Sequence, residues 1–220
     1  IIDINPMMVD PVEKDFNICL GSPCLDAGDP EIIDPDGTRS DIGVYYDEHP
    51  YIEFGKVLYI SQYGNDSTGD GSIENPYRTI QHGIDMSFHR DTVLVMNGIY
   101  VEHIDFDYKC IVLASNYVYS GDTLDIQNTV IDGDSTGTVI RMFSVDSLTE
   151  IRGLTIQRGY IDEGDGAGIV YRHSGIRIFD NRIIRHFGKH TNSALNSINS
   201  DARILNNEIR ENTSWWGRTI

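Results

Sequence analysis

The sequence has no apolar run long enough to cross a membrane, and it has few basic residues. A transmembrane helix needs about 20 consecutive apolar residues, so no membrane insertion is expected. The chain has 17 Lys and Arg against 34 Asp and Glu, a net charge of -17 at pH 7. Because nucleic-acid binding needs a basic surplus, no nucleic-acid partner is expected. The 220 residues, 40% of them hydrophobic, suffice to bury a core.

Cysteine is also scarce, and this limits disulfides and zinc sites. The three cysteines, Cys19, Cys24 and Cys110, contain no CxxC pair, so no zinc site is predicted. At most one disulfide can form. Cys19 and Cys24 could bridge a short loop or remain two reduced thiols, and the cysteine content therefore leaves the redox compartment open.

What the sequence does have is an internal repeat in its last third. The segments 149–156, 175–183 and 201–209 align with steps of 27 and then 26 residues. The alignment makes two rows of isoleucine, which are Ile151, Ile178, Ile204 and Ile156, Ile183, Ile209. Each unit carries short alternating runs of β-branched residues instead of a helical stripe. The repeat therefore predicts an all-β solenoid of parallel strands, with one coil per repeat.

The same alignment predicts the corner of each coil. Gly153, Asp180 and Asn206 share one register, and these residue types tolerate a positive φ at low cost. The next positions hold Asn181 and Asn207, whose stacked amides can hydrogen-bond from coil to coil. Charged residues form three further rows, expected to be solvated ladders about 4.8 Å apart: Glu150, Arg177, Arg203; Arg182, Glu208; and Arg158, Arg185, Glu211.

Residues 51–91 are expected to open the solenoid, and residues 92–220 to form its coils. After Pro76, the segment 77–88 places Ile80, Ile84 and Phe88 on one helical face, with Thr79 as the N-cap. This short helix is expected to cover the first coil, because a terminal coil otherwise exposes apolar interior and an unpaired strand edge.

The opening segment also carries a family resemblance. The run 59–81, which starts Tyr-Ile-Ser-Gln-Tyr-Gly, together with 91–95 and 98–102, resembles the start of secreted bacterial β-helix repeat proteins with the pectin-lyase-like fold. The resemblance covers about 57–220. It implies a right-handed parallel β-helix and a location outside the cell or on its surface. It is weak for function, because relatives include polysaccharide lyases, hydrolases, epimerases and adhesins.

Residues 1–50 form a loop-rich segment that resembles the closing segment of such a solenoid. The resemblance rests on 3–11, 21–30 and 34–43, rich in Asp, Pro and Gly. Here a closing segment precedes an opening one. One interpretation is that the chain comes from a larger tandem protein. Another is that this segment packs on a neighbouring copy and joins chains end to end.

The N-terminal segment is also the candidate calcium site. Five carboxylates lie within 16 residues, and oxygen-rich loops with alternating acids and a Gly turn suit Ca²⁺. The spacing is not that of an EF-hand, and Asp residues that only form turns are the alternative. The candidate ligands are Asp26, Asp29, Asp34, Asp36 and Asp41.

Catalytic and sugar-binding residues are less clearly marked. Asp180, Arg182, Arg185 and His186 could form a base cluster, although charged ladders explain the same arginines. Tyr160, Trp215 and Trp216 could stack on sugar rings or fill the core. The sequence thus predicts a noncatalytic extracellular structural or carbohydrate-binding β-helix that self-assembles end to end into filaments, with polysaccharide or copies of itself as partners. The alternative is a polysaccharide lyase or glycoside hydrolase acting on an acidic polysaccharide.

Overall fold

The computed structural model describes residues 8–10, 15–18, 24, 27–32, 39–40, 42, 55–189 and 193–215. The chain divides into two compact units, Ile1–Gly55 and Lys56–Ile220. In the first unit, β1 (Met8–Asp10) and β2 (Asp15–Ile18) pair antiparallel. A turn nearby is closed by the Gly28 amide, which donates to the Ser40 carbonyl.

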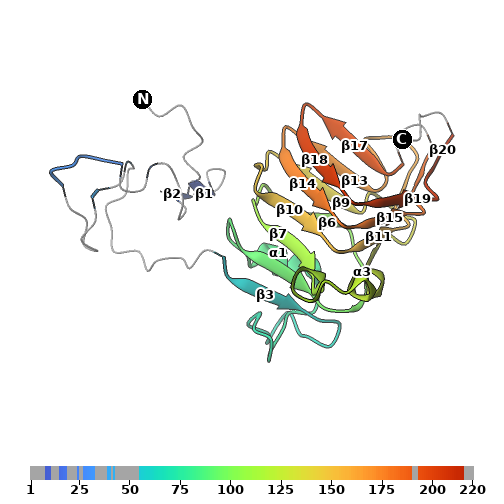
Figure 1. Cartoon of the computed structure of the whole chain (residues 1–220), viewed down its shortest axis with the longest axis horizontal. Helices are drawn as coiled ribbons and strands as arrows, with labels where there is room; N and C mark the ends of the chain where they lie inside the picture. The colour runs from blue at the N-terminus through green and yellow to red at the C-terminus, as the bar shows by residue number, and fades with distance from the viewer. Residues whose placement is uncertain are drawn as a thin grey trace. The chain divides into compact units, whose positions relative to one another are not determined.

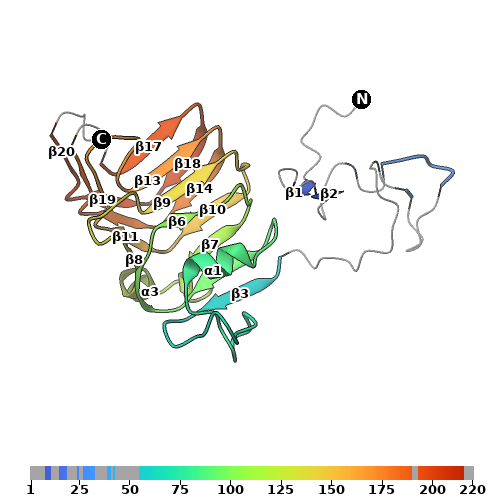
Figure 2. The same ribbon diagram turned by 180° about the vertical axis from the view of Figure 1, so that it is seen from behind.

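The second unit is a right-handed parallel β-helix, shown from two sides in Figures 1 and 2. Its six-stranded sheet contains, in spatial order, β18 (Asp201–Leu205), β14 (Gly175–Phe179), β10 (Thr149–Arg152), β7 (Val112–Ser115), β4 (Thr92–Val95) and β3 (Val57–Ile60). The five-stranded sheet contains β19 (Glu208–Arg210), β15 (Arg182–Ile184), β11 (Thr155–Gln157), β8 (Thr129–Asp132) and β5 (Gly98–Val101).

Two smaller sheets complete each coil. One contains β17 (Leu195–Ile198), β13 (Ile169–Arg172), β9 (Ile140–Phe143) and β6 (Ile104–Asp105). The other contains β12 (Tyr160–Ile161), β16 (Phe187–Gly188) and β20 (Thr213–Ser214). Within the described solenoid the paired strands all run parallel. The predicted fold class is confirmed.

The strand register is the one that the repeat predicts. Ile151 pairs with Ile178, and Ile178 with Ile204; the second isoleucine row pairs in the same way. Ile178 and Ile183 are fully buried, whereas Ile204 is 38% exposed and Ile209 37% exposed. The first two members of each row therefore form the core, and the third is covered on the side of the preceding coil.

The opening of the solenoid also follows the prediction. The helix α1 (Ile80–Asp85) begins after Thr79, whose side chain accepts a hydrogen bond from the His82 amide. Ile80 and Ile84 are fully buried, and α1 packs on β3, β4 and β6. Phe88 lies beyond the helix and is 43% exposed, because the helix ends at Asp85. The strand β3 pairs with β4, so the six-stranded sheet begins at Val57 rather than at 92.

The corner between the six- and five-stranded sheets has the predicted conformation. Gly153, Asp180 and Asn206 have φ values of 72°, 58° and 58°. The asparagine that follows in each later coil serves the coil before it: Asn181 accepts from the Leu154 amide at 3.0 Å and donates to the Ile151 carbonyl at 2.9 Å. Asn207 repeats this role by accepting from the Asn181 amide at 2.9 Å.

One coil departs from this short corner. Between β7 and β8 the chain inserts two helices, α2 (Tyr117–Ser120) and α3 (Thr123–Asn128). In later coils the same connection is two residues long, for example Asp180 and Asn181 between β14 and β15. The helical insertion, residues 116–128, therefore projects beside the corners of the coils that follow (Figure 1).

Candidate binding groove

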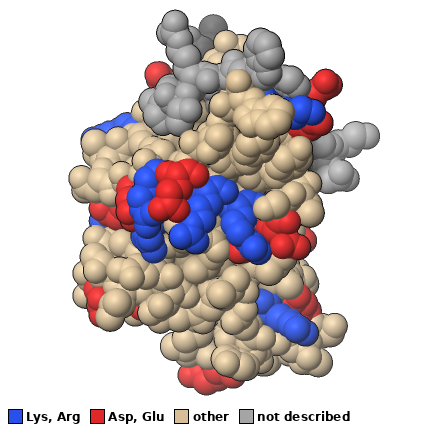
Figure 3. Space-filling view, turned by 90° about the vertical axis from the view of Figure 1, so that its right-hand side faces the viewer, with Lys and Arg blue, Asp and Glu red and all other residues tan. Residues whose placement is uncertain are grey.

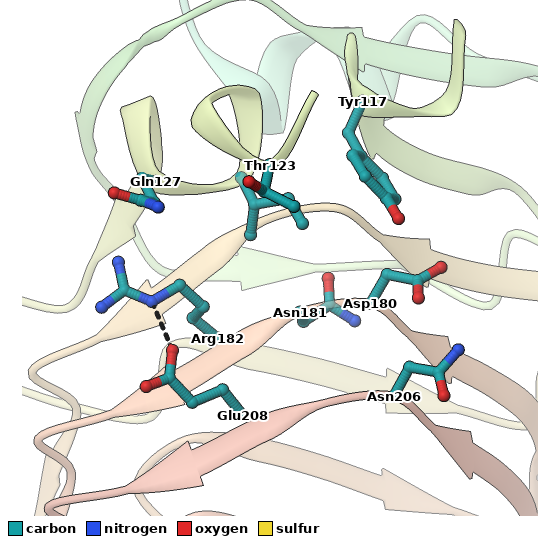
Figure 4. A pocket seen from close by; sticks show the side chains of 9 residues that line it. Tyr117, Thr123, Gln127, Asp180, Asn181, Arg182, Asn206 and Glu208 are labelled. Carbon is teal, nitrogen blue, oxygen red and sulfur yellow. Dashed lines mark hydrogen bonds and ion pairs between the residues drawn. The ribbon is translucent and has the colours of Figure 1, made fainter. Parts of the chain in front are cut away.

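The helical insertion and the neighbouring corners enclose an open cavity of about 450 Å³, the groove described below. Figure 4 shows side chains from both sides pointing into it. The residues that line it are Tyr117, Thr123, Ile126, Gln127, Asp180, Asn181, Arg182, Asn206 and Glu208. They come from α2, α3 and the corners of two successive coils, which places residues far apart in the sequence at one site.

The helical insertion is fixed to the solenoid by hydrogen bonds and by packing. The Ser115 hydroxyl donates to the Gly153 carbonyl, and the Thr155 hydroxyl donates to the Ile126 carbonyl at 2.7 Å. Ile126 is buried. Within the insertion, the Asp125 carboxylate accepts from the Ser120 hydroxyl at 2.6 Å, and this bond lowers the pKa of Asp125. The groove therefore has a rigid upper wall.

Gly153 explains how Tyr117 comes to lie in the groove. A Cβ atom at Gly153 would approach the Ser115 Oγ to 2.8 Å and the Tyr117 Cβ to 2.9 Å, too close for either atom. Gly153 also has φ of 72°. The corner of this coil thus needs glycine for conformation and for space, whereas Asp180 and Asn206 serve at the equivalent positions of the later coils.

The charged side chains of the groove are paired with one another. The Arg182 Nε donates to Glu208 at 2.7 Å, and the Arg152 Nε donates to Asp180 at 3.0 Å. Hydrogen bonds from Arg182 and Arg210 lower the pKa of Glu208. These ion pairs are part of a band of acidic and basic side chains on the face shown in Figure 3. The groove carries little net charge as a result.

The charged rows predicted from the sequence form in part. Arg185 Nε lies 2.8 Å from Glu211, as the third row predicts, but Glu150 and Arg177 are 4.0 Å apart. Arg158 neighbours Arg185 of like charge in its row and instead binds Asp132 at 2.8 Å. Burial opposes ionisation of Asp132, but hydrogen bonds from Arg158, the Asp134 amide and Gln157 outweigh it and lower the pKa of Asp132.

His186, one of the four candidate catalytic residues, is buried in a second corner. Its Nδ1 accepts from the Gly159 amide at 2.9 Å, and its Nε2 lies 3.1 Å from the Ile156 carbonyl, so Nε2 carries the proton. Burial lowers the pKa of His186 to about 4. The equivalent residue of the next coil, Asn212, makes the same two bonds to His186 and Ile183. His186 therefore acts as a ladder residue in the position of an asparagine.

The four candidate catalytic residues do not form one cluster. Asp180 and Arg182 line the groove. Arg185 is exposed and paired with Glu211, and His186 is 1% exposed with both ring nitrogens occupied. Spacing in the sequence brought them together, but successive turns of the chain direct them to different places.

Of the candidate calcium ligands, Asp29 is described and exposed. Its carboxylate accepts a hydrogen bond from the Glu31 amide at 2.9 Å, which is a turn-forming contact. Asp26, Asp34, Asp36 and Asp41 lie outside the described residues, as does Cys19 of the possible Cys19–Cys24 pair. Among the residues that are described, no group of three or more His, Cys, Asp or Glu is placed to hold a metal ion. The calcium site stays a prediction.

Two of the three candidate stacking residues come together through a residue that the sequence did not indicate. Tyr160 stacks on Phe187 with ring centroids 5.5 Å apart and 6° between planes, and Phe187 meets Trp215 edge-on at 6.1 Å. One face of the Tyr160 ring is thus covered by Phe187, while Trp215 is 68% exposed. Trp216 lies outside the described residues. The aromatic row Tyr160, Phe187 and Trp215 joins three coils.

Comparison with family models, curated proteins and solved structures gave no match. No helix in the described part of the chain combines the length and apolar character that spanning a membrane requires.

Proposed function

We propose that the chain is a noncatalytic extracellular β-helix with a structural or carbohydrate-binding role, secreted or held at the cell surface. One observation carries the noncatalytic part. Each of the four residues considered for catalysis makes a contact that holds neighbouring coils or strands together: Asp180 with Arg152, Arg182 with Glu208, Arg185 with Glu211, and His186 with Gly159 and Ile156. The extracellular location rests on the resemblance described above.

The alternative of a lyase or glycoside hydrolase is favoured by one feature, since Asp180 and Glu208 line the same groove. A hydrolase needs one carboxyl group that stays protonated, and this requires a raised pKa. The pKa of Glu208 is lowered by Arg182 and Arg210. A lyase needs an unpaired basic side chain near the substrate, whereas Arg182 is bound to Glu208. The groove is therefore better suited to binding than to cleavage.

The test is an assay for cleavage. The protein is incubated with polygalacturonate and with neutral plant and bacterial polysaccharides, with and without Ca²⁺, and new reducing ends and unsaturated products are measured. No cleavage above buffer is expected. Cleavage that disappears in both Asp180→Asn and Glu208→Gln variants, with the fold retained by circular dichroism, would establish the hydrolase or lyase instead.

Self-association end to end is the second proposal, and the solenoid end formed by β18 and β19 supports it. Apolar side chains there are more exposed than those of the preceding coil: Ile204 38%, Leu205 50% and Ile209 37%, against 0% for Ile178 and Ile183. At the other end, α1 packs on the first coil, and the Tyr59 and Ser61 amides bond to the carbonyls of Gly71 and Tyr77. The two ends thus differ, and a contact between unlike ends propagates into a filament.

Replacing Ile204 with lysine is expected to reduce this association. A charge placed in the apolar surface opposes burial against a second copy, and the cost to folding is limited because the side chain is already partly exposed. Sedimentation velocity over a range of concentrations should show extended oligomers for the unchanged chain and monomers for Ile204→Lys. Leu148→Lys, at an apolar side chain 47% exposed elsewhere, is the matched control. A chain that stays monomeric, or stops at dimers, contradicts filament formation.

A further inference from the structure

We infer that the groove under the helical insertion binds a neutral sugar, held between α2 and α3 on one side and the corners of the later coils on the other. This inference deepens the carbohydrate-binding part of the proposed function by assigning it a site and a ligand class. The cavity of about 450 Å³ falls within the range of about 300–1,000 Å³ typical of small-molecule sites.

The hydrogen-bonding groups of the groove indicate a ligand with several hydroxyls. Within the described residues, no protein group pairs with the side-chain polar atoms of Tyr117, Thr123, Gln127 or Asn206, although each lines the cavity. Together they offer two hydroxyls and two amides, and each hydroxyl or amide can both donate and accept. Adjacent sugar hydroxyls need this mixture, because each one also donates and accepts.

Charge argues for a neutral ligand over an acidic one. The basic group that lines the groove, Arg182, is neutralised by Glu208, and a second carboxylate, Asp180, lies at the same site. An anionic sugar would meet two carboxylates and no uncompensated cation. A phosphate or uronate is therefore disfavoured by like charge, while a neutral sugar can use the outer atoms of these ion pairs as directed donors and acceptors.

An aromatic ring supplies the apolar contact that sugar recognition needs. Tyr117 is half-buried at the start of α2, and Figure 4 shows its ring extending toward Asp180 and Asn181. The C–H groups on one face of a pyranose pack against such a ring. Gly153 holds open the space beside Tyr117, so the corner conformation of the coil and the position of the ring depend on each other.

The experiment measures binding of defined neutral oligosaccharides by ligand-observed NMR and calorimetry. The probes are the β-1,4-linked tetrasaccharides of glucose, mannose, galactose and xylose, with the galacturonate tetrasaccharide as the acidic comparison. At least one neutral probe is expected to bind, and the acidic probe to bind at least about tenfold more weakly. Tyr117→Ala and Gln127→Ala should each weaken binding of that neutral probe at least about tenfold.

The control is Tyr119→Ala, which removes an aromatic side chain that is 65% exposed on the same helix but does not line the groove. It is expected to leave binding unchanged. The inference is overturned if none of the neutral probes binds, if the acidic probe binds more tightly, or if binding survives both groove variants and is lost in Trp215→Ala. None of these results bears on cleavage, so failure here is distinct from failure of the noncatalytic proposal.

Discussion

Replacing Asn181 with alanine is expected to lower the free energy of unfolding by about 3 kcal/mol. Asn181 is 1% exposed, and its amide satisfies the Leu154 N–H and the Ile151 carbonyl of the preceding coil. Leu154 and Ile151 are themselves buried, so water cannot readily take the place of the lost amide. A buried polar group left without a partner costs about 1–3 kcal/mol. Urea denaturation, with unchanged slope, measures the loss.

Asn207→Ala is the matched control for this prediction. Asn207 makes the same contacts one coil later, to the Asn181 amide and the Ile178 carbonyl, but its side chain is half-buried. Water can reach its partners, so a loss of about 1 kcal/mol is expected. Equal losses in the two variants would show that the ladder contributes through something other than burial of polar groups.

Stability is also expected to depend on pH through His186. Burial lowers the pKa of His186 from its ordinary 6.5 to about 4. The unfolded chain therefore takes up a proton on this residue at a higher pH than the folded chain does. The contribution of His186 is complete above pH 6.5, declines as the pH falls from 6.5 to about 4, and is then constant. Its full size is about 3 kcal/mol, at about 1.4 kcal/mol per pKa unit.

The variant His186→Asn should remove this pH dependence and keep the ladder. Asparagine can accept from the Gly159 amide and donate to the Ile156 carbonyl, as Asn212 does toward His186 and Ile183. The difference between the unchanged chain and the variant, measured by denaturation from pH 7 to pH 4, isolates His186 from the carboxylates that titrate in the same range. His173→Asn, at an exposed histidine with φ of 49°, is the control. A difference that does not change with pH contradicts the prediction.

The fold was predictable because the repeat leaves several independent traces. The isoleucine rows fix the register, and residue types that tolerate positive φ fix the corner. Both signals agree on steps of 27 and 26 residues. The ion pairs Arg182–Glu208 and Arg185–Glu211 follow from the same register. Each of these features depends on which residues are neighbours on adjacent coils, and the sequence period determines that directly.

The groove was not predictable in the same way. Its upper wall is the helical insertion, whose helices α2 and α3 are four and six residues long, too short for a helical stripe of apolar residues to show in the sequence. The insertion also interrupts the period, since Val112 pairs with Glu150, 38 positions later. His186 was misread for a related reason: a sequence shows that a histidine lies beside charged residues, but not that its ring points into a corner and is buried.

The ladder side chains give the solenoid a direction. Asn181, His186 and Asn207 each complete the hydrogen bonding of the coil before their own. Because the contacts repeat from coil to coil, gain or loss of a whole repeat in evolution would bring an equivalent side chain under the same amide. Gain or loss of a single residue would place that side chain out of register with its amide. Change in the length of this protein should therefore come in steps of one coil, or as insertions at the corners such as residues 116–128.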